Sequence, residues 1–174
     1  MNRKRVWVFI MATCAFVVQA LCSTAGADGP DCRPTSGAPT NPRAVPVVRI
    51  SAVNEKDDII VKVEITNRGS SPYRLLERDL PTDGLMTKTM FWVYRDDQEI
   101  RYTGMAIDRQ ITESDYLTVD AGCRCTTTIG LAQHYDVTPK GMYRIQYNAA
   151  VERVGGDGER VYWLKSNVIV AHRK

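Results

Sequence analysis

The stretch that decides the fold of this 174-residue chain is Ile59-Ile60-Val61-Lys62-Val63-Glu64-Ile65-Thr66, residues 59–66. Its odd-numbered positions are all Ile or Val, and its even-numbered positions are mostly polar. A period of two is typical of a β-strand with one buried and one solvated face. The residues that follow, 67–70 (NRGS), have the composition of a turn. Residues 143–149 repeat the alternation, with Tyr143 and Tyr147 on one face.

Further strand-like segments follow the same pattern and are separated by Gly, Pro, Asn and Asp. They lie at residues 45–52, 73–76, 91–94, 100–107, 116–119, 125–131 and 161–170. Polar turns at 95–99 and 155–158 predict hairpins, and 112–115 predicts one helical turn capped by Thr112. The pattern predicts an all-β fold, an immunoglobulin-like or fibronectin-like antiparallel β-sandwich of seven to nine strands.

Tyr143 lies two residues after Gly141, an arrangement found at the tyrosine corner of Greek-key sandwiches. In that corner the tyrosine hydroxyl bonds to nearby backbone. An ordinary strand tyrosine is the alternative interpretation.

The N-terminus has the three parts of a secretory signal peptide: the basic start MNRKR, an apolar run and a small-residue stretch. Ala25-Gly26-Ala27 predicts cleavage after Ala27, so that 1–27 is the signal peptide, 28–44 a flexible Pro-rich leader and 45–174 the sandwich domain. An uncleaved anchor is disfavoured because the apolar run is short and contains Gln19. Lipid attachment at Cys22 is disfavoured because Leu21 precedes it.

The formal charge of +3 comes from Arg3, Lys4 and Arg5 in the predicted signal peptide. Without them, the 20 remaining basic residues equal the 20 acidic ones. No basic cluster indicates nucleic acid or an anionic membrane surface as a partner after signal cleavage.

Signal cleavage at the predicted position removes Cys14 and Cys22 and leaves Cys32, Cys123 and Cys125. An odd count in an exported protein indicates a free thiol, a mixed disulfide or a dimer link. Cys123 and Cys125 share one face of a strand, so a bond between them would be strained. The relaxed alternative joins Cys32 to one of the two and fixes the leader to the sandwich.

Several short motifs occur in a fixed order between Thr66 and Tyr147. They are TNRG, RLL before a Pro-containing loop, a Phe-containing strand with an acidic turn, IRYTG, ESDYLTVDAG and YDVTPKGMYRIQY. In this order they resemble the non-catalytic domain that precedes the zinc peptidase domain of deuterolysin-like (peptidyl-Lys type) secreted metalloendopeptidases. The resemblance implies a β-sandwich associated with such a peptidase. Because 27 residues follow Tyr147, too few for a peptidase domain, we expect the domain to stand alone.

The residues needed for catalysis by such a peptidase have no counterpart in this sequence. Zinc peptidases of this type use two histidines one helical turn apart with a glutamate between them. The chain has two histidines, His134 and His172, and neither lies in such a motif. A Cys–His pair would require Cys123 or Cys125 close to His134. We predict no catalytic, metal or cofactor site, and we predict that the protein is not an enzyme.

Residues 91–94 (FWVY) carry large apolar side chains on both faces of a strand, and Tyr162-Trp163 repeat the pattern. One face must pack in the core, and the other, if exposed, is a contact surface. We expect the apolar residues of the long loop 77–89 to cover that second face.

The sequence thus predicts an exported, non-enzymatic binding module, periplasmic or extracellular, acting as inhibitor, chaperone or targeting partner of a secreted zinc peptidase. The candidate contact residues belong to two loops on the rigid scaffold: Arg78, Leu80, Leu85, Met86, Thr112 and Tyr116. A structural or surface-adhesion protein with a disulfide-linked dimer is the alternative, and a hydrolase is a minor one.

Overall fold

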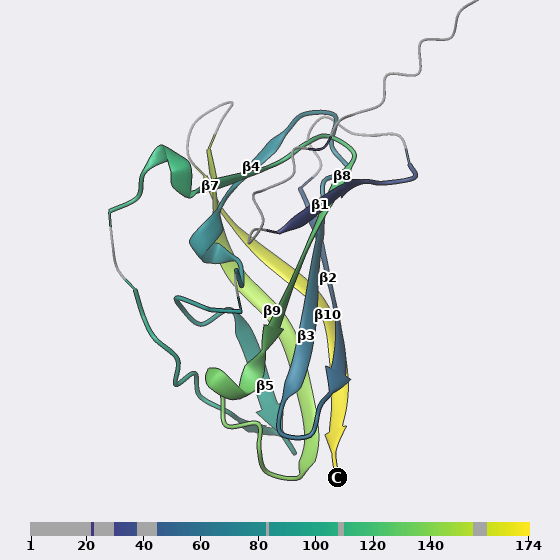
Figure 1. Ribbon diagram of the computed structural model, residues 1–174, viewed down its shortest axis with the longest axis vertical. Coiled ribbons are helices and arrows are strands. Elements are labelled where there is room, and N and C mark those ends of the chain that lie inside the picture. Colours follow the sequence, from purple (N-terminus) through teal and green to yellow (C-terminus); the bar gives the residue numbers. More distant parts are fainter. Residues whose placement is uncertain (1–21, 23–29, 38–44, 83, 108–109, 155–159) are drawn as a thin grey trace, which may run out of the picture.

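The described part of the molecule is a sandwich of two antiparallel sheets (Figure 1). The computed structural model describes residues 22, 30–37, 45–82, 84–107, 110–154 and 160–174, with backbone alone for 151–154 and 160–161. The predicted all-β sandwich is confirmed. The predicted signal peptide apart from Cys22, and the predicted turn at 155–158, lie outside the described residues.

The first sheet has four strands, in the spatial order β1 (Asp31–Pro34), β8 (Cys123–Gly130), β3 (Ile59–Thr66) and β2 (Val47–Asn54). The second sheet is built around a long central strand, β9 (Gly141–Val154). One edge of β9 pairs with β10 (Arg160–Arg173). Its other edge pairs with β5 (Phe91–Arg95) and β4 (Tyr73–Leu76), which lead outward to β6 (Gln98–Glu99) and β7 (Tyr116–Val119). Within the described residues, three short 3₁₀ helices join the strands: η1 (Glu77–Asp79), η2 (Glu113–Asp115) and η3 (Leu131–Gln133).

The core lies between the sheets and follows the alternation predicted from the sequence. In β3, Ile59, Val61, Val63 and Ile65 are buried, while the residues between them are half-buried or exposed. In β9 the inward ladder of Tyr143, Ile145 and Tyr147 is fully buried. Burial of one large apolar side chain stabilises a fold by roughly 1.5–3 kcal/mol, so these two strands supply much of the driving force for sheet stacking.

Of the two interpretations of Tyr143, the structure shows the tyrosine corner. Its hydroxyl donates to the carbonyl oxygen of Pro139 at 2.6 Å, and the residue is buried. Gly141 precedes it with a φ of +149°. A Cβ added at Gly141 would lie 2.7 Å from a carboxylate oxygen of Asp96, so the corner requires glycine at this position.

The hairpin predicted around 95–99 exists, but its second strand is much shorter than predicted. Asp96 and Asp97 form a two-residue turn with φ of +46° and +70°, as a type I′ turn requires. Strand β6 then ends at Glu99, and the strand predicted over 100–107 is absent apart from a bridge between Tyr102 and Tyr135. The physical reason is that Tyr102 turns inward, with its hydroxyl 2.8 Å from two loop carbonyl oxygens.

The N-terminal segment contributes more structure than a flexible leader would. Strand β1 lies within 28–44 and pairs with β8. Cys32 is bonded to Cys125, one of the two relaxed pairings expected, and Cys123 is bonded to Cys22. With β1 and the two-residue β6, the described residues contain ten strands, more than the seven to nine predicted.

Replacement of Tyr143 by Phe should lower the free energy of unfolding by about 0.5–1.5 kcal/mol, because it removes one buried hydrogen bond and little apolar area. Urea unfolding at neutral pH measures the loss. Tyr94→Phe is the matched control, since it removes a hydroxyl from a half-buried ring on the opposite face of the same sheet. Equal stability of the two variants would contradict a structural role for the Tyr143 corner.

Candidate functional site

The outer surface of the second sheet exposes a group of large apolar side chains. Cross-strand pairing places Trp92, Gln146 and Val168 in one row across β5, β9 and β10. Tyr94, Arg144 and Val170 form the next row. We call this surface the outer face and define it by these residues: Trp92, Tyr94, Arg144, Gln146, Trp163, Lys165, Val168 and Val170.

The outer face owes part of its composition to an irregularity in β10. The register of β10 against β9 shifts between Lys165 and Val168, where two residues oppose one. In a regular strand the side chains of Lys165 and Val168, which are three residues apart, would point to opposite sides of the sheet. The bulge instead directs both outward, next to Trp92 and Gln146. Sequence alternation alone assigns Lys165 to one face and Val168 and Val170 to the other, so the pattern does not group these three residues.

Cationic side chains border the exposed rings. The Lys165 ammonium lies 5.0 Å from the ring centre of Trp92, and the Arg144 guanidinium lies 5.6 Å from that of Tyr94. Arg144 also forms an ion pair of 2.6 Å with Asp97 in the hairpin turn. A shallow cavity of about 190 Å³ opens between these groups, lined by Trp92, Tyr94, Arg144, Ile145, Gln146 and Val168.

The prediction that loop 77–89 covers this face is wrong. Trp92 is 41% exposed and Trp163 67% exposed, as are Val168 at 55% and Val170 at 53%. The apolar loop residues Leu80 and Met86 turn the other way and are buried in the core between the sheets. The loop therefore fills the sandwich and leaves the outer face to solvent.

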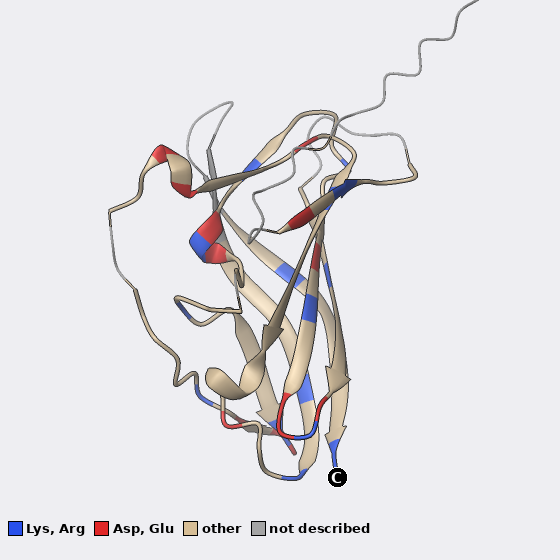
Figure 2. Ribbon diagram, viewed as in Figure 1, with Lys and Arg blue, Asp and Glu red and all other residues tan. Residues whose placement is uncertain are grey.

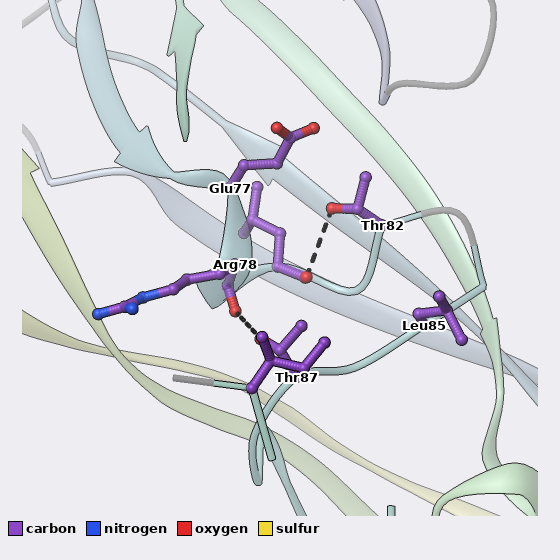
Figure 3. A pocket seen from close by; sticks show the side chains of 7 residues that line it. Glu77, Arg78, Thr82, Leu85 and Thr87 are labelled. Atoms are coloured by element: carbon purple, nitrogen blue, oxygen red, sulfur yellow. Dashed lines mark hydrogen bonds between the residues drawn. The ribbon is translucent and has the colours of Figure 1, made fainter. Parts of the chain in front are cut away.

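The same loop forms a second surface, which we call the loop groove. It is a cavity of about 230 Å³ lined by Glu77, Arg78, Leu80, Thr82, Leu85, Thr87 and Ile107. Figure 3 shows Thr82, Leu85 and Thr87 around it, while the side chain of Arg78 extends away from Thr82 and Leu85. The hydroxyl of Thr87 donates to the Arg78 carbonyl oxygen at 3.0 Å, and the backbones of Thr82 and Leu85 pair with each other.

The loop groove rests on a buried polar anchor at Asp79. The hydroxyl of Tyr147 donates to the Asp79 carbonyl oxygen at 2.7 Å. The Asp79 carboxylate is paired with Lys88, whose ammonium also donates to the carbonyl oxygen of Ala150 at 3.1 Å. Because Tyr147 belongs to the central strand, this anchor fixes helix η1 to the sandwich core.

The predicted contact residues fall into two groups. Arg78 and Leu85 line the loop groove at the surface, and Leu85 is 56% exposed. Leu80 and Met86 are buried, so their side chains support the loop and do not form an exposed contact. The other predicted loop supplies Thr112, which precedes η2, and Tyr116, which begins β7.

The two predicted contact loops are neighbours in space. Tyr116 pairs with Leu76, the residue before η1, so β4 and β7 bring η1 and η2 to adjacent strand ends. Arg74 links them further, with an ion pair of 2.7 Å to Glu113 and its guanidinium 4.7 Å from the Tyr116 ring centre. The predicted helical turn is confirmed, and the Thr112 N–H donates to Asp115 at 2.6 Å.

The structure does not form the Cys–His pair considered from the sequence. Both candidate cysteines are in disulfides near the start of β8, whereas His134 follows η3 beyond the end of that strand. His134 is buried and stacks on Tyr102, with ring centres 6.0 Å apart. Among the described residues, no group of three or more His, Cys, Asp or Glu side chains is placed to hold a metal ion.

Charged residues of both signs are interspersed along the described ribbon (Figure 2). The two short acidic segments at η1 and η2 each lie close to an arginine, Arg78 or Arg74. Over the same described ranges, no helix is both long and apolar enough to cross a bilayer.

The comparisons with known proteins relate part of this chain to an extracellular protease. No family model matches the chain. Over 92 residues it is 36% identical to an Aeromonas hydrophila protein named "Extracellular protease", a match that covers 52% of this chain and 26% of that protein. The chain thus contains a protease-related region and spans about a quarter of that relative's length. Together with the two disulfides, this similarity points to an exported protein.

A solved structure of the Bacillus subtilis protein YcdA, named as a lipoprotein, was also found. The match covers 83% of this chain and 37% of the YcdA chain. The identity is 14% and the TM-score is 0.27, a value too low to indicate a shared fold.

Because the Tyr147 hydroxyl holds the loop groove in place, we expect the folded protein to lose stability at alkaline pH. Burial, and secondarily the charge of Asp79, raises the pKa of Tyr147. The unfolded chain therefore releases this proton first, and the free energy of unfolding falls as pH rises above the ordinary tyrosine value of about 10. Urea unfolding at pH 8 to 11 should show a weaker decline in Tyr147→Phe than in the wild type. An unchanged slope in Tyr147→Phe would contradict the assignment.

The exposure of the outer face can be checked by fluorescence. Trp92 and Trp163 are the tryptophans outside the predicted signal peptide, since the third is Trp7. We expect acrylamide to quench both, and to quench Trp163 more strongly because it is 67% exposed against 41% for Trp92. Trp92→Phe and Trp163→Phe provide the two single-tryptophan proteins. Weak quenching of both would mean that the face is covered in solution.

Proposed function

We propose that this protein is an exported, non-enzymatic binding module whose outer face docks on a secreted zinc peptidase. The observation that carries the proposal is the exposure of Trp92, Trp163, Val168 and Val170 together on one sheet. Scattered exposed apolar residues are normal on a protein surface, but a contiguous group marks an interaction site.

The chemistry of the outer face favours a protein partner. Trp, Tyr and Arg are enriched in protein interfaces and at the positions that contribute most to binding energy. Here Trp92, Tyr94 and Arg144 lie side by side on paired strands, and the shallow cavity between them could receive a side chain. The rigid β-sheet also limits the entropy lost on association.

Two similarities support a peptidase as that partner. Part of the chain matches about a quarter of an extracellular protease, and its motifs resemble the non-catalytic domain that precedes the catalytic domain in deuterolysin-like enzymes. In such an enzyme the two regions are joined covalently. We propose that the present protein supplies such a non-catalytic region to a secreted zinc peptidase, as inhibitor, chaperone or targeting domain.

The alternative of a structural or adhesive protein with a disulfide-linked dimer has less support. Cys22, Cys32, Cys123 and Cys125 are paired within the chain. A cysteine link between chains would have to displace one of these bonds or use Cys14, which lies outside the described residues. Non-reducing electrophoresis distinguishes the two alternatives, since the binding module is expected to migrate as a monomer.

The binding proposal predicts a specific, chelator-sensitive partner. Immobilised protein should retain an endopeptidase from the culture supernatant of the source organism, recognised by mass spectrometry and by loss of its activity on chelation. The double variant Trp163→Lys/Val170→Lys should weaken binding of that purified peptidase at least about tenfold, which corresponds to about 1.4 kcal/mol. Both positions are more than half exposed, so the fold should be retained.

Two further variants distinguish the outer face from other exposed surfaces. Met105→Lys changes an equally exposed apolar residue, 68% exposed, outside the outer face, and should leave the dissociation constant unchanged. Leu85→Lys tests the loop groove. Weakening by Leu85→Lys alone would transfer the site to the loop groove, and retention of no peptidase would refute the proposal.

A further inference from the structure

The strand β8 carries two disulfides side by side, and one of them uses a residue of the predicted signal peptide. Cys125 is bonded to Cys32 with a Cα–Cα distance of 4.0 Å, and Cys123 is bonded to Cys22 with a distance of 6.0 Å. We propose that the exported protein retains Cys22, because its signal peptide is cleaved between Ala20 and Leu21 and not after Ala27. The processing site and the Cys22–Cys123 bond are then two parts of one maturation pathway.

The structure gives each cysteine of β8 a different partner. Cys123 and Cys125 lie two residues apart and are both buried on the inner side of the sheet. The neighbouring strand β1 presents Cys32 opposite Cys125 but Pro34 opposite Cys123. Strand β1 therefore provides a disulfide partner for Cys125 only. Cys22 forms the disulfide with Cys123 and packs against the core cluster.

Cleavage after Ala27 would break this arrangement. It would remove Cys22 and leave Cys123, which is fully buried in the disulfide-bonded structure, without its partner. Cys125, in the same strand, would already be bonded to Cys32. The mature chain would then hold three cysteines, an odd count that exported proteins seldom keep. Retention of Cys22 gives four cysteines and two closed bonds.

The sequence before Cys22 contains a suitable cleavage site. Val18-Gln19-Ala20 is of the A-x-A-like type, and the apolar run from Val6 to Val18 has the length of an h-region, roughly 7–15 residues. A signal peptide of 20 residues also falls in the usual range of about 15–30. The later Ala25-Gly26-Ala27 motif matches the same rule but lies on the wrong side of Cys22.

The covalent steps balance as follows. A signal peptidase adds water across the Ala20–Leu21 peptide bond, which leaves a carboxylate on Ala20 and a free amine on Leu21. Cys22 and Cys123 then lose two protons and two electrons to a disulfide-bearing thiol oxidant of the export compartment, which is reduced to a dithiol. A thioether-linked lipid on Cys22 would occupy the same sulfur, so lipidation and the Cys22–Cys123 bond exclude each other.

Intact mass and N-terminal sequencing of the full chain, expressed with its own signal and recovered from whole culture, test the proposal. The expected product begins at Leu21, resists alkylation until reduced, and then takes up four alkyl groups, one for each of Cys22, Cys32, Cys123 and Cys125. Digestion without reduction should yield a peptide pair linking Cys22 to Cys123. A product that begins at Asp28, that carries lipid on Cys22, or that keeps residues 1–20 overturns the proposal.

A matched pair of signal variants gives a second readout that does not depend on folding of the domain. Ala20→Tyr should abolish the Leu21 terminus, because the residue before the cleaved bond must be small. Ala27→Tyr should leave that terminus unchanged. Loss of processing in Ala27→Tyr, with normal processing in Ala20→Tyr, would show that cleavage follows Ala27.

Discussion

The burial of one ladder of side chains in β9 determines the arrangement of the rest of the molecule. Tyr143, Ile145 and Tyr147 are fully buried between the sheets. Both tyrosines carry a hydroxyl that must find a partner in an apolar interior, and each finds a backbone carbonyl. Tyr143 closes the corner at Pro139, and Tyr147 holds the loop at Asp79. Strands β10, β5 and β4 are then placed by pairing with the backbone of the same strand.

Because side chains alternate along a strand, the inward ladder also determines what faces solvent. Arg144 and Gln146 must point outward, and the residues that pair with them across β5 and β10 join the same surface. The bulge in β10 has a second effect besides enlarging this face. Its residue Asn167 accepts from the Ile50 N–H and donates to the Ile50 carbonyl oxygen, both at 3.0 Å. A side-chain amide thus occupies backbone groups at the edge of β2, along which β10 lies.

The sequence predicted those parts of the fold in which local pattern and tertiary packing agree. The period of two found β3 and β9, and the glycine at 141 indicated the corner at Tyr143. The failures occurred where tertiary contacts override the local pattern. Strand-like residues 100–107 lie in irregular structure because the half-buried Tyr102 packs against the core, and the bulge in β10 brings Lys165 and Val168 to one face. Cys22 was missed because the apolar and small residues around it have the composition of a signal peptide, and composition carries no information about a partner 101 residues away.

The disulfides and the outer face belong to opposite sheets, and this separation matters for stability. Exposed residues such as Trp163 and Val170 add little to the stability of the isolated protein, and exposed apolar groups favour aggregation when a chain unfolds. A disulfide that closes a long loop typically stabilises the folded state by about 2–4 kcal/mol, chiefly by restricting the unfolded chain. The bonds at Cys123 and Cys125 close separations of 101 and 93 residues on the first sheet. Covalent stabilisation of one sheet therefore lets the other keep an apolar surface exposed to solvent.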